Sequence, residues 1–185
     1  MSFKVKLFSG APDYETLHVA KLTCFPLEKR DYKPYSQARI CFAEDGLHVQ
    51  LLAFEAKPLP DSAMKAVFQL QPDLESLVLT LCANGHFHAC LASESAQMPL
   101  NASVHTFTGE DLQGVYWGGN VLVPQAELDK CFPDFKVQKN STFTGNLYKL
   151  CENPTKPHYG CFYPADFEKP LVDPSNLGEF IIIDF

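Results

Sequence analysis

The chain has 185 residues, of which 46% are hydrophobic and 20% are charged, as in an ordinary globular protein. This length suits one domain, and no repeat or break in composition divides residues 1–185. Lys and Arg total 15 against 22 for Asp and Glu, so the formal net charge is -7. Because nucleic-acid binding usually requires a basic surface, we expect no nucleic-acid partner.

The start of the chain is not followed by an apolar run of signal-peptide length, and no stretch approaches the roughly 20 apolar residues of a membrane-spanning helix. We therefore expect a cytoplasmic protein with no membrane partner. The cysteines are odd in number and widely spaced, with no C-x-x-C motif, which argues against a disulfide framework and a zinc ribbon. We expect most to be buried thiols in a reducing compartment. The seven are Cys24, Cys41, Cys82, Cys90, Cys131, Cys151 and Cys161.

Alternation of apolar and polar residues, the pattern of half-buried strands, dominates the chain. The first predicted hairpin joins residues 38–42 to residues 47–53 through a turn at Asp45-Gly46. A further strand is predicted over residues 64–70.

A second hairpin is marked by its turn. Leucines alternate over residues 77–81, Asn84-Gly85 follows, and residues 87–91 return. Asn-Gly between two alternating runs is the strongest short-range hairpin signal, so this hairpin is predicted more firmly than the first.

The second half of the chain continues the pattern. Strands are predicted over residues 114–123 and 142–150, with a buried terminal strand over 180–185. A short helix is predicted over Pro124–Phe132, and the proline-rich stretch 154–178 is predicted to be an ordered loop across the fold. These elements predict an all-β fold, an antiparallel β-sandwich of jelly-roll or immunoglobulin-like type with one or two short helices.

No motif for phosphate binding, dinucleotide binding or hydrolysis is present. His86 and His88 share one face of a predicted strand and could bind one metal ion, but no third ligand is evident. Two solvent-facing side chains are the simpler interpretation.

Aromatic residues give a clearer indication. Tyr116 and Trp117, the only Trp, are flanked by glycines within residues 114–119. Sugar rings stack on aromatic faces, while polar side chains bond to their hydroxyl groups, so this segment could form a sugar platform. The other interpretation is that Trp117 belongs to the core of a strand.

The C-terminal part of the chain carries a series of motifs. Thr144-Gly-Asn-Leu-Tyr-Lys-Leu-Cys151 precedes Lys156-Pro-His-Tyr-Gly-Cys-Phe-Tyr-Pro164, and Asp166-Phe-Glu-Lys-Pro170 precedes Leu177-Gly-Glu-Phe-Ile-Ile-Ile183. The series resembles the end of the family 9 carbohydrate-binding modules, and a looser similarity extends over residues 38–185. The resemblance implies a jelly-roll-like sandwich related to the DOMON group. It also implies sugar binding between aromatic rings and, in some members, structural calcium.

From the resemblance we expect a non-catalytic module that binds a mono- or oligosaccharide. The sugar would stack on Trp117, Phe162 or Tyr163, and Phe162 stands where the family has Trp. Tyr148 and His158 could instead be structural. The side chains expected to offer hydrogen bonds are those of Tyr116, His158, Asn146 and Tyr148.

Other interpretations stay open. A protein-interaction or scaffold domain could keep the fold without the sugar site, and a small enzyme could use a Cys/His or carboxylate pair. A DOMON-like haem binder would need a ligand on each face of the haem, for which His86, His88 and Met98 are available. No other cofactor is expected, although Asp166, Glu168 and Asp173 are loop acids that could hold calcium.

Overall fold

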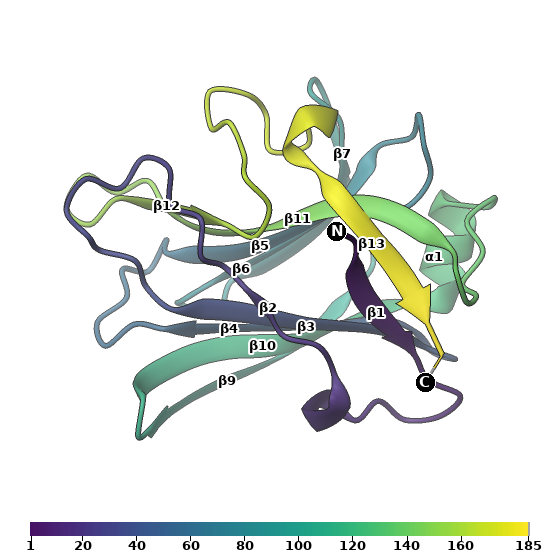
Figure 1. The fold of residues 1–185 in the computed structure, drawn as a ribbon, viewed down its shortest axis with the longest axis horizontal. Coiled ribbons are helices and arrows are strands. Elements are labelled where there is room, and N and C mark those ends of the chain that lie inside the picture. The colour runs from purple at the N-terminus through teal and green to yellow at the C-terminus, as the bar shows by residue number, and fades with distance from the viewer. Residues whose placement is uncertain (185) are drawn as a thin grey trace.

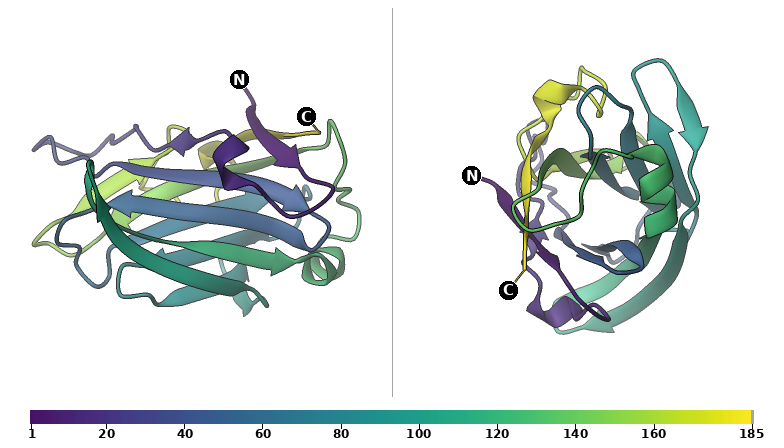
Figure 2. Two further views of the ribbon diagram at one scale, coloured as in Figure 1. Left: turned by 90° about the horizontal axis from the view of Figure 1, so that it is seen from below. Right: turned by 90° about the vertical axis from the view of Figure 1, so that its right-hand side faces the viewer.

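The computed structural model describes residues 1–184, which form a curled β-sheet whose two halves face each other (Figures 1 and 2). Phe185, the last residue of the predicted terminal strand, lies outside the described residues. The first strands are β1 (Phe3–Leu7), β2 (Ala20–Lys21), β3 (Ser36–Ala43), β4 (Gly46–Phe54), β5 (Ala63–Gln69), β6 (Ser76–Cys82) and β7 (Phe87–Ala92). The later strands are β8 (Gln97–Pro99), β9 (Ser103–Asp111), β10 (Gly114–Pro124), β11 (Thr142–Cys151), β12 (His158–Cys161) and β13 (Gly178–Ile183).

The sheet follows one continuous path, β8-β7-β6-β5-β11-β13-β1-β3-β4-β10-β9, while β12 pairs with β11 and β2 with β3. Figure 1 shows β5, β6 and β11 in one layer and β3, β4, β9 and β10 in the other, with β1 and β13 joining them at one side. The predicted all-β sandwich is therefore confirmed. One departure is that β1 runs parallel to both β13 and β3, whereas the other strand pairs are antiparallel.

Both predicted hairpins are present. In the first, Gly46 begins β4 with a φ of 141°, and a Cβ there would lie 2.1 Å from the carbonyl oxygen of Val123. In the second, Gly85 has a φ of 85° between β6 and β7. Positive φ angles favour glycine, which explains why both turns are legible in the sequence.

The helical segment α1 (Gln125–Cys131) lies over one end of the sandwich (Figure 2, right). Pro124 is its N-cap, and Leu128 is its buried residue. Two short 3₁₀ turns, η1 (Tyr14–Thr16) and η2 (Pro174–Asn176), complete the helical structure. No helix in residues 1–184 has both the length and the apolar character needed to cross a membrane.

Several segments differ from the sequence predictions, which included none of the strands β1, β2 and β8. The stretch 154–178 is not only a loop, because residues 158–161 pair with β11 as strand β12 and residues 174–176 form η2. Strand β9 was not predicted, because it is exposed along most of its length and lacks apolar alternation.

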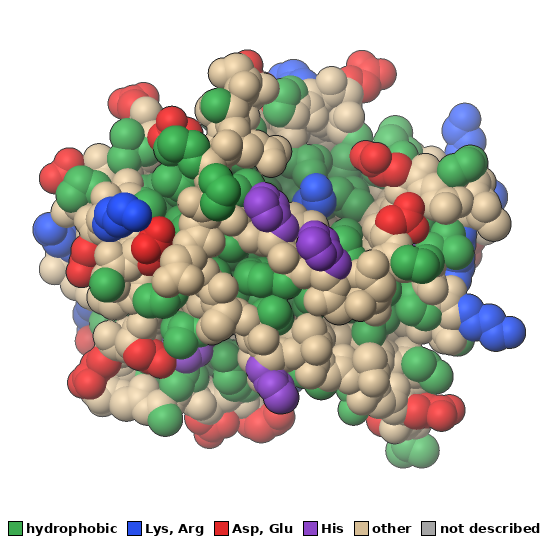
Figure 3. All heavy atoms as spheres, turned by 180° about the vertical axis from the view of Figure 1, so that it is seen from behind, with side chains coloured by type: hydrophobic (Ala, Val, Ile, Leu, Met, Phe, Trp, Pro, Cys, Tyr) green, Lys and Arg blue, Asp and Glu red, His purple; other side chains and the backbone are tan. Residues whose placement is uncertain are grey.

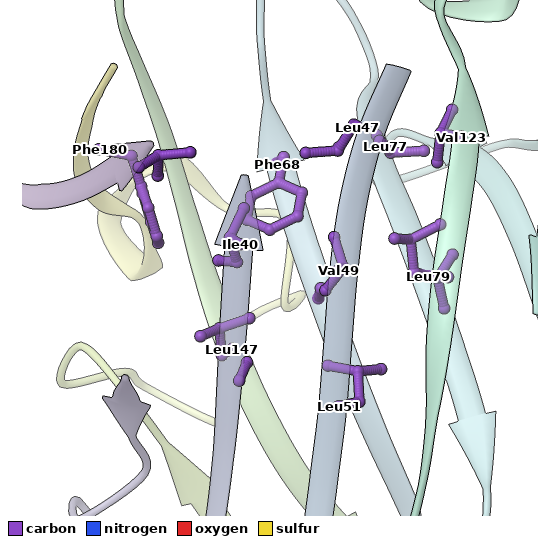
Figure 4. Close-up of a cluster of buried hydrophobic side chains, with 14 of the residues drawn as sticks. Ile40, Leu47, Val49, Leu51, Phe68, Leu77, Leu79, Val123, Leu147 and Phe180 are labelled. Carbon is purple, nitrogen blue, oxygen red and sulfur yellow. The ribbon is translucent and has the colours of Figure 1, made fainter. Parts of the chain in front are cut away.

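The core lies between the two layers (Figure 4). Aliphatic side chains from β3 and β4 face Phe68, Leu77 and Leu147 from the other layer. At one side, the rings of Phe143 and Phe180 stack with centroids 5.2 Å apart and planes at 12°. Phe68 packs edge-on against both, so these rings join β5, β11 and β13.

We predict that Phe180→Ala lowers the free energy of unfolding by about 3–5 kcal/mol, because it opens a cavity among fully packed rings. Urea unfolding followed by circular dichroism measures the loss. Met98→Ala, at a side chain that is 53% exposed on β8, is the control and should change stability by about 0.5 kcal/mol or less. Equal effects of the two substitutions would contradict this description of the core.

Candidate functional site

A group of buried polar side chains lies at the end of the sandwich opposite α1, where strands from both layers begin or finish. Glu55 directly follows β4, Ser62 directly precedes β5, Lys149 lies near the end of β11, and His158 begins β12. These four side chains are buried, with exposed fractions of 3% or less. We call them the Glu55–Lys149 cluster.

The ammonium group of Lys149 has all its hydrogen-bonding capacity satisfied inside the protein. Lys149 Nζ lies 2.5 Å from Ser62 Oγ, 2.6 Å from His158 Nε2 and 3.0 Å from Glu55 Oε2. An ammonium carries three N–H donors, so these three acceptors match it completely. A buried charge is tolerated only when it is paired and hydrogen-bonded in this way.

The Glu55 carboxylate is the second centre of the cluster. Its Oε2 accepts from the Ser62 hydroxyl at 2.8 Å and from Trp117 Nε1 at 3.1 Å, and its Oε1 accepts from the Tyr32 hydroxyl at 3.3 Å. A backbone hydrogen bond of 3.0 Å from Glu55 to Val115 holds the residue beside β10. The carboxylate thus connects both layers with the segment that contains Tyr32.

Burial and the mutual charges determine the protonation states. Burial opposes ionisation of Glu55, but the charge and hydrogen bond of Lys149 and the Ser62 hydroxyl outweigh it and lower the pKa. Burial lowers the pKa of Lys149, and the Glu55 carboxylate offsets part of this shift. Burial and then the Lys149 charge lower the pKa of His158 to about 4. At neutral pH, His158 is an uncharged acceptor at Nε2, and its Nδ1–H donates to the Lys156 carbonyl at 3.0 Å.

Two half-buried residues cover the cluster. The ring of Tyr32 meets that of His158 edge-on, with centroids 5.5 Å apart. Lys156 Nζ lies 4.8 Å from the centre of the Tyr32 ring and donates to the Lys57 carbonyl at 3.3 Å. The cation–π contact therefore holds Tyr32 over the buried charges.

A hollow of about 450 Å³ lies beside this cover, and His158 belongs both to the cluster and to the lining of the hollow. Within it, the Arg30 guanidinium donates to Glu28 at 3.3 Å and to the Pro157 carbonyl at 2.5 Å, joining the two walls. The hollow is lined by Leu27, Glu28, Lys29, Arg30, Pro157, His158 and Tyr159. We call it the Arg30–Tyr159 hollow.

Of the site residues expected from the sequence, the structure brings Trp117 and His158 together. His158 is a member of the Glu55–Lys149 cluster and Trp117 donates to its Glu55, while Lys149 Nζ lies 5.5 Å from the Trp117 ring centre. The Trp117 side chain is only 4% exposed, so its ring presents no open face in this conformation.

Asn146 and Tyr148 lie elsewhere, beneath the C-terminal loop. Asn146 Nδ2 donates to the carbonyls of Tyr163 at 2.9 Å and Asn176 at 2.7 Å, while its Oδ1 accepts from the Tyr163 backbone at 2.9 Å. The Tyr148 hydroxyl donates to the Leu171 carbonyl at 3.0 Å. Both side chains are fully buried and hold the loop to β11.

The remaining predicted residues are half-buried and fall in two places: Phe162 and Tyr163 contact each other, with ring centroids 4.7 Å apart, whereas Tyr116 lies on another strand. Phe162 packs against Phe3 with ring centroids 5.3 Å apart, and the Tyr163 hydroxyl donates to the Glu179 carbonyl at 2.6 Å. Tyr116 lies on β10, where its ring contacts those of Phe54 and Phe107. The seven residues expected to bind a sugar therefore do not form one surface.

The sequence patterns do not predict the Glu55–Lys149 cluster or the residues that cover it. In the sequence, Lys149 stands out only as part of the C-terminal motif, and Glu55, Ser62 and Tyr32 carry no signal because they lie far apart along the chain. One signal points to the cluster. Lys149 lies in β11, a strand that is buried on both faces, and a buried lysine requires a buried acceptor.

The loop acids that could hold calcium are occupied by local turns. Asp166 accepts from the Glu168 backbone at 3.0 Å, and Asp173 accepts from the Ser175 backbone at 2.8 Å as the N-cap of η2. Across residues 1–184, no group of three or more His, Cys, Asp or Glu side chains could hold a metal ion. Asp166, Glu168 and Asp173 therefore do not form a cluster of carboxylate ligands.

The predicted histidine pair is open to solvent. His86 and His88 are both exposed, at the β6–β7 turn and on β7. Figure 3 shows histidines in the middle of the rear face, where uncharged side chains predominate and most charges lie toward the rim.

The cluster makes stability depend on pH. Between pH 6.5 and about 4, unfolded His158 binds a proton that the folded protein excludes, so the free energy of unfolding falls as the pH falls through this range. We expect this from urea unfolding at pH 7, 5.5 and 4.5. His158→Gln should flatten the dependence, whereas His88→Gln at an exposed site should leave it unchanged. An unaltered pH dependence in His158→Gln would contradict the assignment.

The contributions of Glu55 and Lys149 to stability should be coupled, because the two residues form one buried ion pair. We predict that Lys149→Met costs about 3–5 kcal/mol of unfolding free energy, because it leaves the Glu55 carboxylate buried without its counter-charge. Adding Glu55→Gln should restore part of the loss. Thermal and urea unfolding of both single variants and the double variant form the test cycle, and additive losses would show that the charges are not coupled.

Among the comparisons with known proteins, the one with solved structures identifies the fold. No protein-family profile and no curated protein sequence matches the chain. Among solved structures, a candidate carbohydrate-binding protein from Bacteroides uniformis is 17% identical with a TM-score of 0.75, and the match covers 98% of this chain and 99% of that one.

Two further solved structures are of a family 9 carbohydrate-binding module from Caldicellulosiruptor kristjanssonii. The glucose complex matches with a TM-score of 0.69 at 7% identity, covering 98% of this chain and 96% of the other. The cellotriose complex matches with a TM-score of 0.71 at 8% identity, covering 100% and 95%. Over nearly its whole length, the chain has the fold of the family 9 carbohydrate-binding modules.

Proposed function

We propose that this protein is a non-catalytic carbohydrate-binding module that takes a mono- or oligosaccharide at the end of the sandwich opposite α1. The observation that carries the proposal is the fold match over nearly the whole chain to modules bound to glucose and to cellotriose. The distribution of polar and aromatic side chains in this chain supports the location.

The Arg30–Tyr159 hollow has the features that a sugar requires. Its volume of about 450 Å³ lies within the range of roughly 300–1,000 Å³ that is usual for small-molecule sites. Tyr159 supplies an aromatic ring, and Glu28 and Arg30 supply an acceptor and donors for hydroxyl groups. Stacking on Tyr159 with hydrogen bonds to these two residues is the binding mode that we propose.

The buried cluster serves this site by fixing its floor. His158 holds Lys149 on one side and lies in the hollow on the other, directly before Tyr159. Because Lys149 and Glu55 bind several strands at once, the floor of the hollow is preformed, and a ligand would spend little binding energy on ordering the floor.

The electrostatics of Glu55 do not suit a general acid. A general acid needs a carboxyl group whose pKa is raised, whereas the pKa of the buried Glu55 is lowered by its partners. Glu55 is also enclosed, with an exposed fraction of 3%. We therefore assign it to positioning.

Calorimetric titration of the purified chain with glucose and cellotriose tests the proposal. We expect saturable binding of at least one sugar and an affinity at least about tenfold lower in Tyr159→Ala, which corresponds to ~1.4 kcal/mol. Tyr116→Ala is the matched control, because Tyr116 is also a half-buried tyrosine but does not line the hollow. The fluorescence of Trp117 provides an independent readout near the cluster.

Two outcomes would count against the assignment. Loss of binding in Phe162→Ala, with Tyr159→Ala unaffected, would move the site to the stacking residues expected from the sequence. No saturable binding of any sugar by the folded protein would overturn carbohydrate binding and favour a scaffold domain.

A further inference from the structure

Two cysteines far apart in the sequence face each other beside the Arg30–Tyr159 hollow. Cys24 and Cys161 form an isolated antiparallel bridge. The Cys24 N–H donates to the Cys161 carbonyl at 3.2 Å, and the Cys161 N–H donates to the Cys24 carbonyl at 2.8 Å. In such a hydrogen-bonded pair the Cα atoms lie about 5.5 Å apart, which is within the usual range for a disulfide.

All seven cysteines are free thiols in the structure. Cys24 and Cys161 differ from the other five because each has a cysteine as its partner on the neighbouring segment. On the strands, the register partners of Cys41, Cys82, Cys90 and Cys151 are not cysteines. Cys131 lies in α1 at the opposite end. Among the described residues, only Cys24 and Cys161 are thus paired with each other.

The two thiols are unequal in access. Cys24 is half-exposed and Cys161 is fully buried, with its Sγ 3.5 Å from the Cys24 carbonyl oxygen. Burial and then the neighbouring Cys24 raise the pKa of Cys161 to about 12. A soluble oxidant would therefore meet Cys24 first, and Cys161 would act as the resolving thiol.

We propose that Cys24 and Cys161 are an oxidative modification site that glutathione disulfide converts into a reversible intramolecular disulfide. The Cys24 thiolate attacks one sulfur of glutathione disulfide, and the first glutathione leaves as a thiolate. The Cys161 thiol then loses its proton and attacks the Cys24 sulfur, which releases the second glutathione. Two protein thiols are oxidised, and one glutathione disulfide is reduced to two glutathione molecules.

The bond would join the two walls of the hollow. Residues 27–30 follow Cys24 and residues 157–159 precede Cys161, so the disulfide would fasten the segments that Arg30 and the Pro157 carbonyl already connect. Oxidation would thus reduce the opening of the hollow and of the cover formed by Tyr32. The chemistry of the pair does not depend on whether the hollow binds a sugar.

The test is to equilibrate the full chain in glutathione buffers of graded ratio, block the remaining thiols with iodoacetamide, and map the peptides by mass spectrometry without reduction. We expect Cys24 and Cys161 to lose alkylation together as one cross-linked species appears, and excess reduced glutathione to reverse this. Hydrogen exchange over residues 25–32 should slow in the oxidised protein.

Variants separate the two steps. Cys161→Ser should stop at a mixed disulfide between Cys24 and glutathione, and Cys24→Ser should leave Cys161 reduced. Cys131→Ser is the control and should form the Cys24–Cys161 bond normally. A wild-type protein that accumulates the mixed disulfide at Cys24, or that leaves Cys24 reduced when Cys131 is fully glutathionylated, would overturn the proposal.

Discussion

The buried ion pair between Glu55 and Lys149 is the interaction on which the end of this sandwich depends. Removing two charges from water costs several kcal/mol for each ion, and attraction alone does not reliably repay this. Here Ser62 and His158 complete the shell of Lys149, while Ser62, Trp117 and Tyr32 serve Glu55. Because these partners come from β10, β12, the residue before β5 and the segment before β3, one buried ion pair with its hydrogen bonds fixes the relative positions of several elements.

The same end joins three features that are separate in the sequence. Residues 24–32 cross over β12, held by the Cys24–Cys161 backbone bridge, by Arg30 on the Pro157 carbonyl and by Tyr32 on Glu55. The hollow lies between this segment and β12. A ligand in the hollow and a change in the thiol pair would therefore act on the same two pieces of chain, and the buried charges beneath would keep the floor unchanged.

The polar residues of the C-terminal motif have a structural role, because their side chains bond to the backbone of the C-terminal loop and do not face solvent. Asn146 binds backbone atoms of Tyr163 and Asn176, and Tyr148 reaches the Leu171 carbonyl. Such contacts maintain a long loop whose only regular structure is the η2 turn, since its backbone groups would otherwise be buried without partners. This explains how a resemblance in these residues predicts the fold well and yet does not locate a ligand.

The sequence by itself determined the strands whose apolar residues alternate, the two glycine turns and the short helix, because each depends on neighbours along the chain. It did not indicate β9, whose surface is mostly exposed, or β12, whose four residues become a strand only by pairing with β11. The Glu55–Lys149 cluster and the Cys24–Cys161 pair were decided by the tertiary structure alone. Their members lie 94 and 137 positions apart; the curling of the sheet brings the two charges into contact, and an isolated backbone bridge places the two cysteines opposite each other.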